Sequence, residues 1–450
     1  MSTAQSANVS SGKPRRSILL VAYFFPPCRD TGAQRPTSMA RHLAALGHKV
    51  TVLTTSAYGS SHSSEDLKLP AGGHRPAVGD GPTSGTLEVV RTGDLQRLRA
   101  RLGGHDHMGS MFDADSYSNR PHPLSRVIVP EPLLVAWAPF AMAQARRLQR
   151  SRGVDCVITT SPPESAHRVG KMLAGRGVPW VADLRDGWSF EPLRPKFPTA
   201  IQRRLDLRLE RRWLGAADVV SCVSAPVAED LRVRGIADPI VIPNGWDPAG
   251  SDGAPVATAP PIDPDRVSLV YTGRFGSYGR NPSGLVAALA ELARTDPDSA
   301  QRLELLIAGP LTEQEQELFG TDVSPARITA LGSIERPAAL ALQRSADALL
   351  VVASPSRSQL ANLKLYEYLA AGPPILALAG GTEAGRITAE AGGTVVSSED
   401  IPGITSALRT LARDGLPSSD PKHRERYIYP RVAERMADAV ELALERRRVI

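Results

Sequence analysis

Cysteines, aromatic residues and long apolar runs are all scarce in this sequence. The 450 residues include three cysteines, which show no CxxC or Cys/His spacing and so argue against a disulfide framework or a zinc site. Aromatic residues make up 5% of the chain and the net charge of +6 is spread along it, so we expect no nucleic-acid partner. No apolar run approaches the roughly 20 residues that cross a bilayer, and the N-terminus does not read as a signal peptide. We therefore expect a cytoplasmic protein.

The length and the pattern of the chain indicate two α/β domains. Short β-branched or leucine-rich runs alternate with helical patterns, which is typical of parallel sheets covered on both faces. In the first half we expect a helix over 33–46 and strands over 17–23, 49–54, 87–91, 156–160, 180–183, 219–223 and 240–242. In the second half we expect helices over 282–295, 336–345 and 364–371 and strands over 267–272, 303–308, 327–331, 348–352 and 374–378. The predicted fold class is α/β, with two Rossmann-like doubly wound parallel sheets.

A composition break rich in Pro, Gly, Ala and Asp separates the halves. We expect a disordered tail over 1–16, a first domain over 17–243, a linker over 244–265 and a second domain over 266–426. A helical pattern over 427–448 follows no strand, and we expect it to pack back on the first domain. Residues 58–85 and 103–123 read as loops.

Loops that follow strands are where open parallel sheets bind ligands. In the first such loop, Gly32 at a helix start permits close backbone approach by a phosphate or an acceptor hydroxyl, although an ordinary turn explains it equally well. In the second, Ser161 is placed to cap the following helix, and His167 is a candidate acceptor contact or a packed histidine.

The third loop has the densest charge of the first half. Asp183, Arg185 and Asp186 can orient sugar hydroxyls through charge-assisted hydrogen bonds, or can form an internal ion-pair network. We therefore count Ser161, His167, Asp183 and Arg185 as acceptor-side candidates.

In the second half, one loop combines glycines with arginines between a strand and a helix. Gly273 lets the backbone approach a diphosphate, and Arg274 and Arg280 can neutralise it. The spacing is not G-x-G-x-x-G, so a nicotinamide or flavin site is a weak alternative.

The fifth loop opens the helix expected over 364–371. Lys364 and the helix dipole favour a diphosphate there, and Glu367 lies one turn further on the same face, where a carboxylate can accept ribose hydroxyls. Without context, such a pair is more often a solvated ion pair.

The order of these five loops resembles the family 4 glycosyltransferases of GT-B fold. The similar segments are residues 18–54 with the Phe24-Phe25-Pro26-Pro27 turn, Asn244-Gly245, Gly273-Arg274 and Gly392-Gly393. The resemblance covers nearly the whole chain. It implies two domains facing a cleft, with a UDP- or GDP-linked sugar as co-substrate held by the second domain.

The resemblance also implies the chemistry. Transfer is expected to retain the anomeric configuration and to need no obligatory metal or other cofactor. Arg274, Arg280 and Lys364 would stabilise the leaving diphosphate, with Asp186 as a further catalytic candidate, and Glu367 would hold the ribose. Asp113-Ala114-Asp115 is the nearest match to a DxD metal motif, and it reads as a polar loop.

Two positions depart from the family pattern. Gln359 stands where the first of two glutamates is usual, and Arg280 stands near the place of a lysine. Together with Ser333, Gln359 is a candidate determinant of donor specificity. The missing glutamate leaves open a catalytically silent sugar-nucleotide-binding subunit. An epimerase is the other alternative, although the second half has no histidine before His423.

The Lys-x-x-Glu-Tyr variant resembles transferases of bacterial surface-polysaccharide assembly, which implies a glycan or lipid-linked acceptor. A helix expected over 200–214 carries five arginines and an apolar stripe. It could dock on anionic lipid at the inner face of the membrane, or it could be a solvated face on which Asp206 and Glu210 pair with the arginines.

Overall fold

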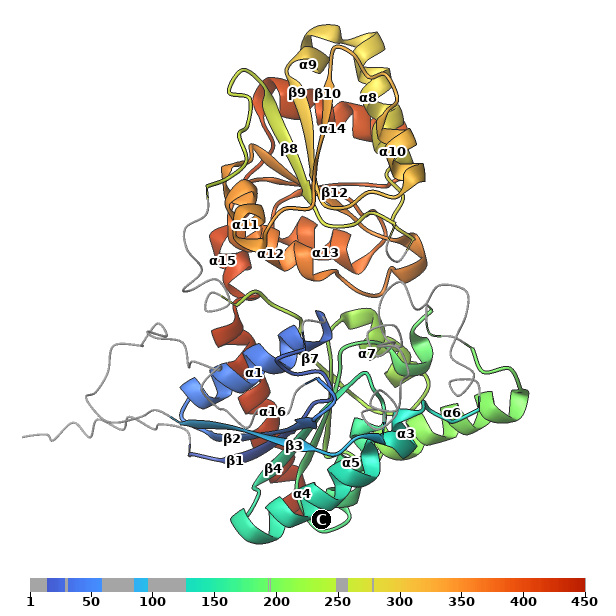
Figure 1. The fold of residues 1–450 in the computed structure, drawn as a ribbon, viewed down its shortest axis with the longest axis vertical. Coiled ribbons are helices and arrows are strands. Elements are labelled where there is room, and N and C mark those ends of the chain that lie inside the picture. The colour runs from blue at the N-terminus through green and yellow to red at the C-terminus, as the bar shows by residue number, and fades with distance from the viewer. Residues whose placement is uncertain are drawn as a thin grey trace, which may run out of the picture.

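The computed structural model describes residues 14–28, 31–58, 85–95, 127–192, 194, 196–247, 258–276 and 279–449. They form two α/β lobes placed end to end (Figure 1). Most of the tail expected over 1–16, residues 248–257 of the linker, and nearly all of the loops expected over 58–85 and 103–123 lie outside these residues, as does Asp113-Ala114-Asp115.

The N-terminal lobe is built on a seven-stranded parallel sheet of order β3-β2-β1-β4-β5-β6-β7. Its strands are β1 (Ser17–Val21), β2 (Lys49–Thr55), β3 (Thr86–Thr92), β4 (Cys156–Ser161), β5 (Trp180–Leu184), β6 (Val219–Cys222) and β7 (Ile240–Val241). Its helices are η1 (Thr31–Ala33), α1 (Gln34–Ala45), α3 (Leu133–Ala136), α4 (Ala138–Arg152), α5 (Ala166–Ala174), η6 (Trp188–Phe190), α6 (Ala200–Leu214) and α7 (Ala225–Val233).

The C-terminal lobe has a six-stranded parallel sheet of order β10-β9-β8-β11-β12-β13. Its strands are β8 (Val267–Thr272), β9 (Leu303–Ala308), β10 (Arg327–Gly332), β11 (Ala348–Val352), β12 (Ile375–Leu378) and β13 (Thr394–Val396). Its helices are α8 (Ser283–Thr295), α9 (Pro297–Gln301), α10 (Glu313–Phe319), α11 (Arg336–Ser345), η9 (Pro355–Arg357), α12 (Leu363–Ala371), α13 (Glu383–Glu390), α14 (Ile401–Asp414) and α15 (Pro421–Glu425).

Each sheet is buried on both faces, which explains why its central strands are almost purely apolar. In the N-terminal lobe one core lies under α4, α5 and α7, and the other under α1 and the last helix, α16 (Tyr429–Val449). In the C-terminal lobe one core lies under α8 and α14, and the other under α11, α12 and α13. The two parallel sheets confirm the predicted α/β fold class.

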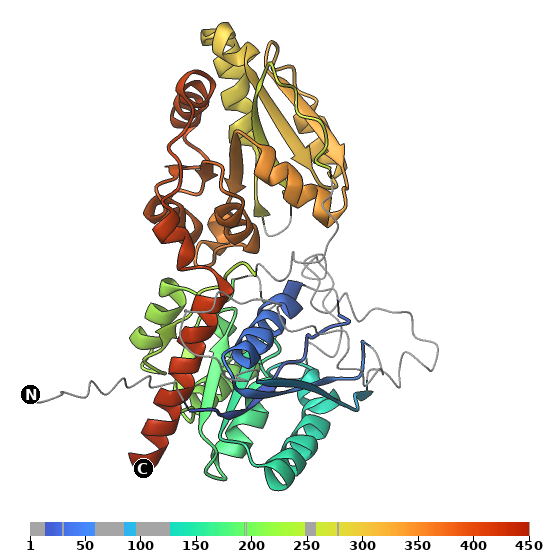
Figure 2. The same ribbon diagram turned by 90° about the vertical axis from the view of Figure 1, so that its left-hand side faces the viewer.

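The last helix returns to the first lobe. Figure 2 shows α16 leaving the C-terminal lobe and running along the N-terminal one. Val432, Met436 and Val440 are buried in the core that also contains Met39 and Leu43 of α1. An ion pair between Arg16 and Glu441, with 2.6 Å between nitrogen and oxygen, fixes the helix near the start of β1. The C-terminal segment is therefore an integral part of the N-terminal lobe.

The strand orders place a switch point in each sheet. All strands are parallel, but successive strands are added toward one edge of the sheet up to β3 or β10 and toward the other edge from β4 or β11 onward, so the order switches between β1 and β4 in the first sheet and between β8 and β11 in the second. Loops that leave neighbouring strands toward opposite sides open a crevice at such a point. The loops after β1 and β8 are therefore favoured for ligand binding by topology alone. Among the described residues, no helix is both long and apolar enough to cross a membrane.

Candidate functional site

The cleft between the lobes contains two adjoining chambers. The first, here named the loop chamber, has a volume of about 430 Å³ and lies between loops that follow the strands. It is lined by Gly32, Arg185 and Asp186 from the N-terminal lobe and by Arg280, Arg357, Lys364 and Glu367 from the C-terminal lobe. The second, the hinge chamber, has about 540 Å³ and extends between α1 and the α11–α12 pair toward Trp246. Gln34, Arg35, Arg336, Leu363 and Glu367 line both.

On the C-terminal side, Glu367 joins two cations at the start of α12. Asn362 caps this helix by accepting a hydrogen bond from the backbone of Leu365, and Lys364 and Glu367 then lie one turn apart with 2.8 Å between Nζ and Oε2. Arg336 at the start of α11 contacts the other oxygen of Glu367 at 2.9 Å. Burial favours the neutral acid, but the two cations outweigh it and lower the pKa of Glu367. Glu367 is therefore an ionised acceptor at the cleft.

The loop after β8 brings a glycine and an arginine to the same place. Gly273 has φ of +130°, a conformation that L side chains avoid, and a Cβ built on it would lie 3.8 Å from Cε of Lys364. Arg280 donates to the carbonyls of Arg274 and Phe275 at 2.9 and 3.3 Å, so its guanidinium stiffens the loop while it lines the loop chamber. The structure therefore brings Gly273, Arg280 and Lys364 together.

Two of the expected donor-side residues lie further out. Arg274 is exposed on the β8–α8 loop, and Ser333 is exposed between β10 and α11. Neither belongs to the described lining of the two chambers.

On the N-terminal side, Arg185 fixes the backbone around the loop chamber. Its guanidinium donates to the carbonyl of Ser161 at 3.0 Å and to the carbonyls of Gly32 and Pro162. The hydroxyl of Ser161 is buried at the end of β4 and does not cap α5, which begins at Ala166 after Ser165. The expectation that Ser161 caps this helix is wrong, because four residues separate it from the first helical residue.

Asp183 is an internal hub rather than a cleft residue. Its Oδ1 accepts from Arg35 at 2.8 Å and from Ser221 at 2.9 Å, and its Oδ2 accepts from Arg35 at 3.1 Å and from Thr160 at 2.9 Å. Arg35 also donates to the carbonyls of Ile242 and Pro243. Burial would raise the pKa of Asp183, but the Arg35 guanidinium and these hydrogen bonds lower it. The alternative of an internal network is thus the one that the structure adopts for Asp183.

His167 lies in the core of the N-terminal lobe. Its ring has no exposed surface, it stacks on Trp188 with 6.0 Å between ring centroids, and its Nδ1 lies 2.7 Å from the hydroxyl of Thr159. Burial lowers the pKa of His167 to about 3, so the ring is neutral near pH 7. The structure corrects the expectation that His167 contacts the acceptor, because tryptophans enclose it.

Asp186 takes part in a contact between the lobes. Arg357, at the end of η9, donates to Asp186 at 2.8 Å and to both oxygens of Glu191 at 2.9 and 3.1 Å. Gln359 donates to the same Glu191 at 3.4 Å. Asp186 and Arg357 line the loop chamber, whereas Gln359 is 5% exposed and turned toward Glu191. The expected contact of Gln359 with the donor sugar therefore stays a prediction, while its amide contacts Glu191.

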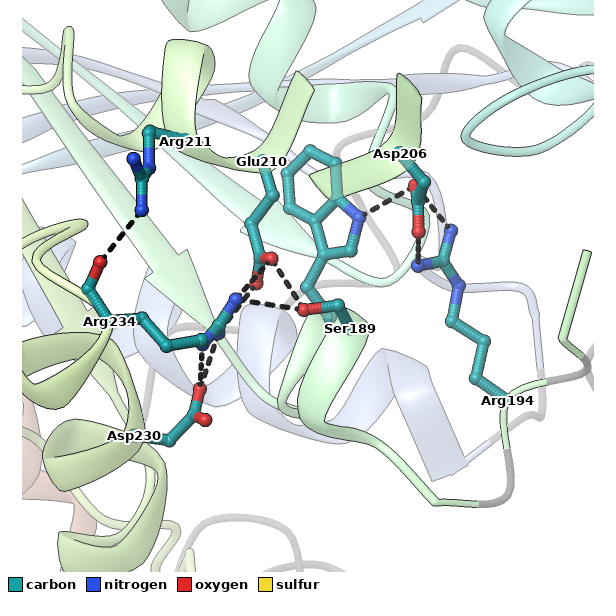
Figure 3. Close-up of polar contacts among 8 residues, drawn as sticks. Ser189, Arg194, Asp206, Glu210, Arg211, Asp230 and Arg234 are labelled. Carbon is teal, nitrogen blue, oxygen red and sulfur yellow. Dashed lines mark hydrogen bonds and ion pairs between the residues drawn. The ribbon is translucent and has the colours of Figure 1, made fainter. Parts of the chain in front are cut away.

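The acidic residues of α6 face the interior (Figure 3). Asp206 binds Arg194 at 2.7 Å and accepts from the indole of Trp188 at 3.0 Å, and Glu210 binds Arg234 at 2.7 Å. Both acids are buried, which contradicts the interpretation of α6 as a solvated face on which Asp206 and Glu210 pair with its own arginines. The outer face keeps Ile201, Arg204, Leu205, Arg208 and Arg212, all of which are exposed.

The described part of the chain contains no candidate metal site. No group of three or more His, Cys, Asp or Glu side chains there could hold a metal ion.

The sequence interpretation did not identify four residues that line the cleft or join the two lobes: Arg35, Glu191, Arg336 and Arg357. Arg336 had a usable signal, since it opens a predicted helix at the carboxyl end of a strand, as Lys364 does. Arg35 lies 148 residues from Asp183 in the sequence, and Arg357 lies 166 residues from Glu191 and 171 from Asp186. No local sequence pattern predicts contacts between residues so far apart.

Comparison with known proteins agrees with this geometry. The model of Glycosyltransferase Family 4 matches residues 35–249, and that of Glycosyl transferases group 1 matches residues 266–414. No curated protein matches the chain in sequence.

Solved structures of similar fold cover nearly the whole chain. Sucrose-phosphate synthase from Thermosynechococcus elongatus is 19% identical with a TM-score of 0.55, and 94% of this chain and 98% of that chain are covered. Trehalose 6-phosphate synthase from Burkholderia multivorans is 14% identical with a TM-score of 0.56, covering 95% and 98%. The N-terminal domain of Candida albicans trehalose-6-phosphate phosphatase is 12% identical with a TM-score of 0.58, covering 98% and 99%. Such identities establish the fold, and the two family models add the class: the chain belongs to the glycosyltransferases, with a family 4 domain and a group 1 domain on a GT-B fold.

Proposed function

We propose that this glycosyltransferase holds a nucleotide-sugar donor on its C-terminal lobe and transfers the sugar to a glycan or lipid-linked acceptor on its N-terminal lobe. The observation that carries the proposal is the pair Lys364 and Glu367, which lines the loop chamber together with Arg185 and Asp186 of the other lobe and has Gly273 beside Lys364. Cations and an open backbone suit a diphosphate, and an ionised carboxylate suits a ribose.

The donor-side roles follow from charge. Lys364 and Arg280 would stabilise the developing charge of the leaving diphosphate, which is the largest single contribution that a fixed site can make. Arg274 would join them from the tip of its loop, and Ser333 would meet the base. Because these are fixed protein cations, the reaction would need no obligatory metal, and either a UDP- or a GDP-linked sugar satisfies the same contacts.

The acceptor side offers fewer groups. Gly32 and Asp186 face the loop chamber and would meet the acceptor, while Arg185 would hold the backbone that shapes this wall. Asp186 is paired with Arg357 and is suited to orient a hydroxyl. We propose that the departing phosphate takes the acceptor proton on the same face of the sugar, which retains the anomeric configuration.

A direct assay tests the transfer. The purified protein is incubated with UDP- and GDP-sugars and a panel of glycan and lipid-linked acceptors, and the released nucleoside diphosphate is measured. Nuclear magnetic resonance then gives the anomeric configuration of the product. Turnover with retention is expected. Donor binding without turnover across the panel would favour a catalytically silent subunit, and an inverted product would refute retention.

We further propose that α6 places the enzyme on an anionic membrane, as synthesis of a cell-surface polysaccharide on a lipid carrier requires. Because Asp206 and Glu210 are buried, the outer face of α6 combines arginines with Ile201, which is 77% exposed. Such a face suits the boundary between anionic headgroups and acyl chains. Figure 1 shows α6 on the outer rim of the N-terminal lobe.

Liposome flotation tests this contact. Vesicles of phosphatidylcholine with and without phosphatidylglycerol are compared at low salt, using Arg204→Glu/Arg208→Glu and a control with the same charge change on α4, Arg147→Glu/Arg150→Glu. Binding to the anionic vesicles should be lost in the α6 variant and kept in the control. No flotation of the wild type, or equal loss in both variants, would refute the role of α6.

A further inference from the structure

A loop of the C-terminal lobe reaches across the cleft. This loop, residues 353–362 between β11 and α12, contributes Arg357, Gln359 and Leu360 to contacts with the N-terminal lobe. Leu360 packs against the core that contains Trp188. Arg357 and Gln359 both contact Glu191, which follows η6.

At this contact one guanidinium faces two carboxylates. The side chain of Glu191 is 4% exposed, and it accepts two hydrogen bonds from the guanidinium of Arg357 and one from the amide of Gln359. The same guanidinium contacts Asp186. A glutamate at position 359 would place a third carboxylate in this group, with its oxygens about as close to Glu191 as the amide nitrogen is now. Two carboxylates at such a distance cannot both stay ionised. The amide at 359 is therefore the partner that Glu191 requires.

We propose that Glu191, Arg357 and Gln359 form an interlobe clasp, and that these positioning residues hold the closed cleft with Lys364 opposite Asp186. Gln359 faces Glu191 rather than the described lining of the loop chamber, whereas Asp186 lines it. Gln359 thus helps to hold the two lobes together. Asp186 of the N-terminal lobe is the carboxylate of this group that lines the loop chamber. The clasp rests on the proposed function in one respect only, namely that the reaction in the closed cleft is sugar transfer.

An exchange of amide and carboxylate tests the clasp. The variants are Gln359→Glu, Glu191→Gln and the two combined, with Gln316→Glu on the exposed face of α10 as a control that adds the same charge to the same lobe. Small-angle X-ray scattering gives the radius of gyration of each full-length protein, and steady-state assays give kcat and KM. Thermal unfolding shows whether each variant is folded.

Gln359→Glu should increase the radius of gyration and lower kcat/KM about tenfold or more, as expected for coupled neighbours. The combined variant should recover part of both, because it restores one amide beside one carboxylate. Lowering the pH should also decrease the radius of gyration of Gln359→Glu, because either Glu191 or the introduced glutamate then takes up a proton. The radius of gyration of the wild type should not change with pH.

Two results would overturn the clasp. One is a Gln359→Glu protein that is as compact and active as the wild type. The other is a combined variant no better than the sum of its parts. Should Gln359→Glu not fold, Arg357→Gln gives the same test at a side chain that is 20% exposed, and a compact, fully active Arg357→Gln protein would contradict the proposal. Scattering needs no substrate, so a failure of the proposed function, seen as no nucleotide-sugar binding, stays distinguishable from a failure of the clasp.

Discussion

Replacing Asp183 with asparagine should destabilise the N-terminal lobe strongly. Each oxygen of Asp183 accepts two hydrogen bonds, and an asparagine would turn its NH₂ group toward two donors. It would also leave the buried Arg35 guanidinium without its counter-charge. Breaking a buried pair in this way typically costs about 3–5 kcal/mol. For a lobe of this size, that loss lowers the melting temperature by about 6–20 °C.

Tryptophan fluorescence during urea unfolding can assign this loss to one lobe. Four of the five tryptophans lie in the N-terminal lobe and the fifth, Trp246, lies at the hinge. Asp347→Asn is the matched control, because Asp347 accepts two hydrogen bonds from Ser268 inside the C-terminal lobe and should leave the fluorescence transition in place. Asp183→Asn/Arg35→Met, which removes the uncompensated charge, should regain part of the loss. If the free energy of unfolding of Asp183→Asn lies within about 1 kcal/mol of the wild-type value, Asp183 does not hold the lobe together as described, because breaking a buried ion pair usually costs more.

Two further substitutions probe the core and the donor loop. Burial lowers the pKa of His167 from 6.5 to about 3, so between these pH values the unfolded chain binds more protons than the folded protein. The free energy of unfolding therefore falls as the pH falls, by about 2 kcal/mol between pH 8 and pH 5. His167→Gln should flatten this dependence in urea unfolding, and a wild-type stability that does not change between pH 8 and 5 would contradict the burial argument. Gly273→Ala, at φ of +130°, should strain the donor loop by about 1–2 kcal/mol and weaken nucleoside diphosphate binding measured by calorimetry. Unchanged affinity would show that the loop does not contact the diphosphate.

Local patterns predicted the sheets well, because buried parallel strands are short apolar runs bounded by loops. Strands over 267–272, 303–308 and 348–352 and the helix over 336–345 have the predicted bounds. The contact between Lys364 and Glu367 was equally predictable from the sequence, because residues three apart on a helix have their side chains on the same face. What these cases share is that the interaction lies within a few residues of chain.

Contacts between distant segments could not be read in the same way. Asp183 meets Arg35, and Glu191 meets Arg357, only because the sheet order and the lobe arrangement bring them together. The orientation of α6, however, could have been predicted from the sequence. Asp206 and Glu210 share a helical face with Trp213, and that large apolar residue marks the side that packs inward.

Calorimetric titration of UDP and of GDP into the wild type, Lys364→Ala and Lys171→Ala most directly tests whether the C-terminal lobe is a nucleotide-sugar site. The Lys171 variant makes the same charge change in the N-terminal lobe, away from the cleft. At least one nucleotide should bind to the wild type. Lys364→Ala should weaken that binding by about 10- to 150-fold, the value of a charge-assisted hydrogen bond, while Lys171→Ala should leave it unchanged. Binding of neither nucleotide, or equal affinity for Lys364→Ala and the wild type, would contradict the account.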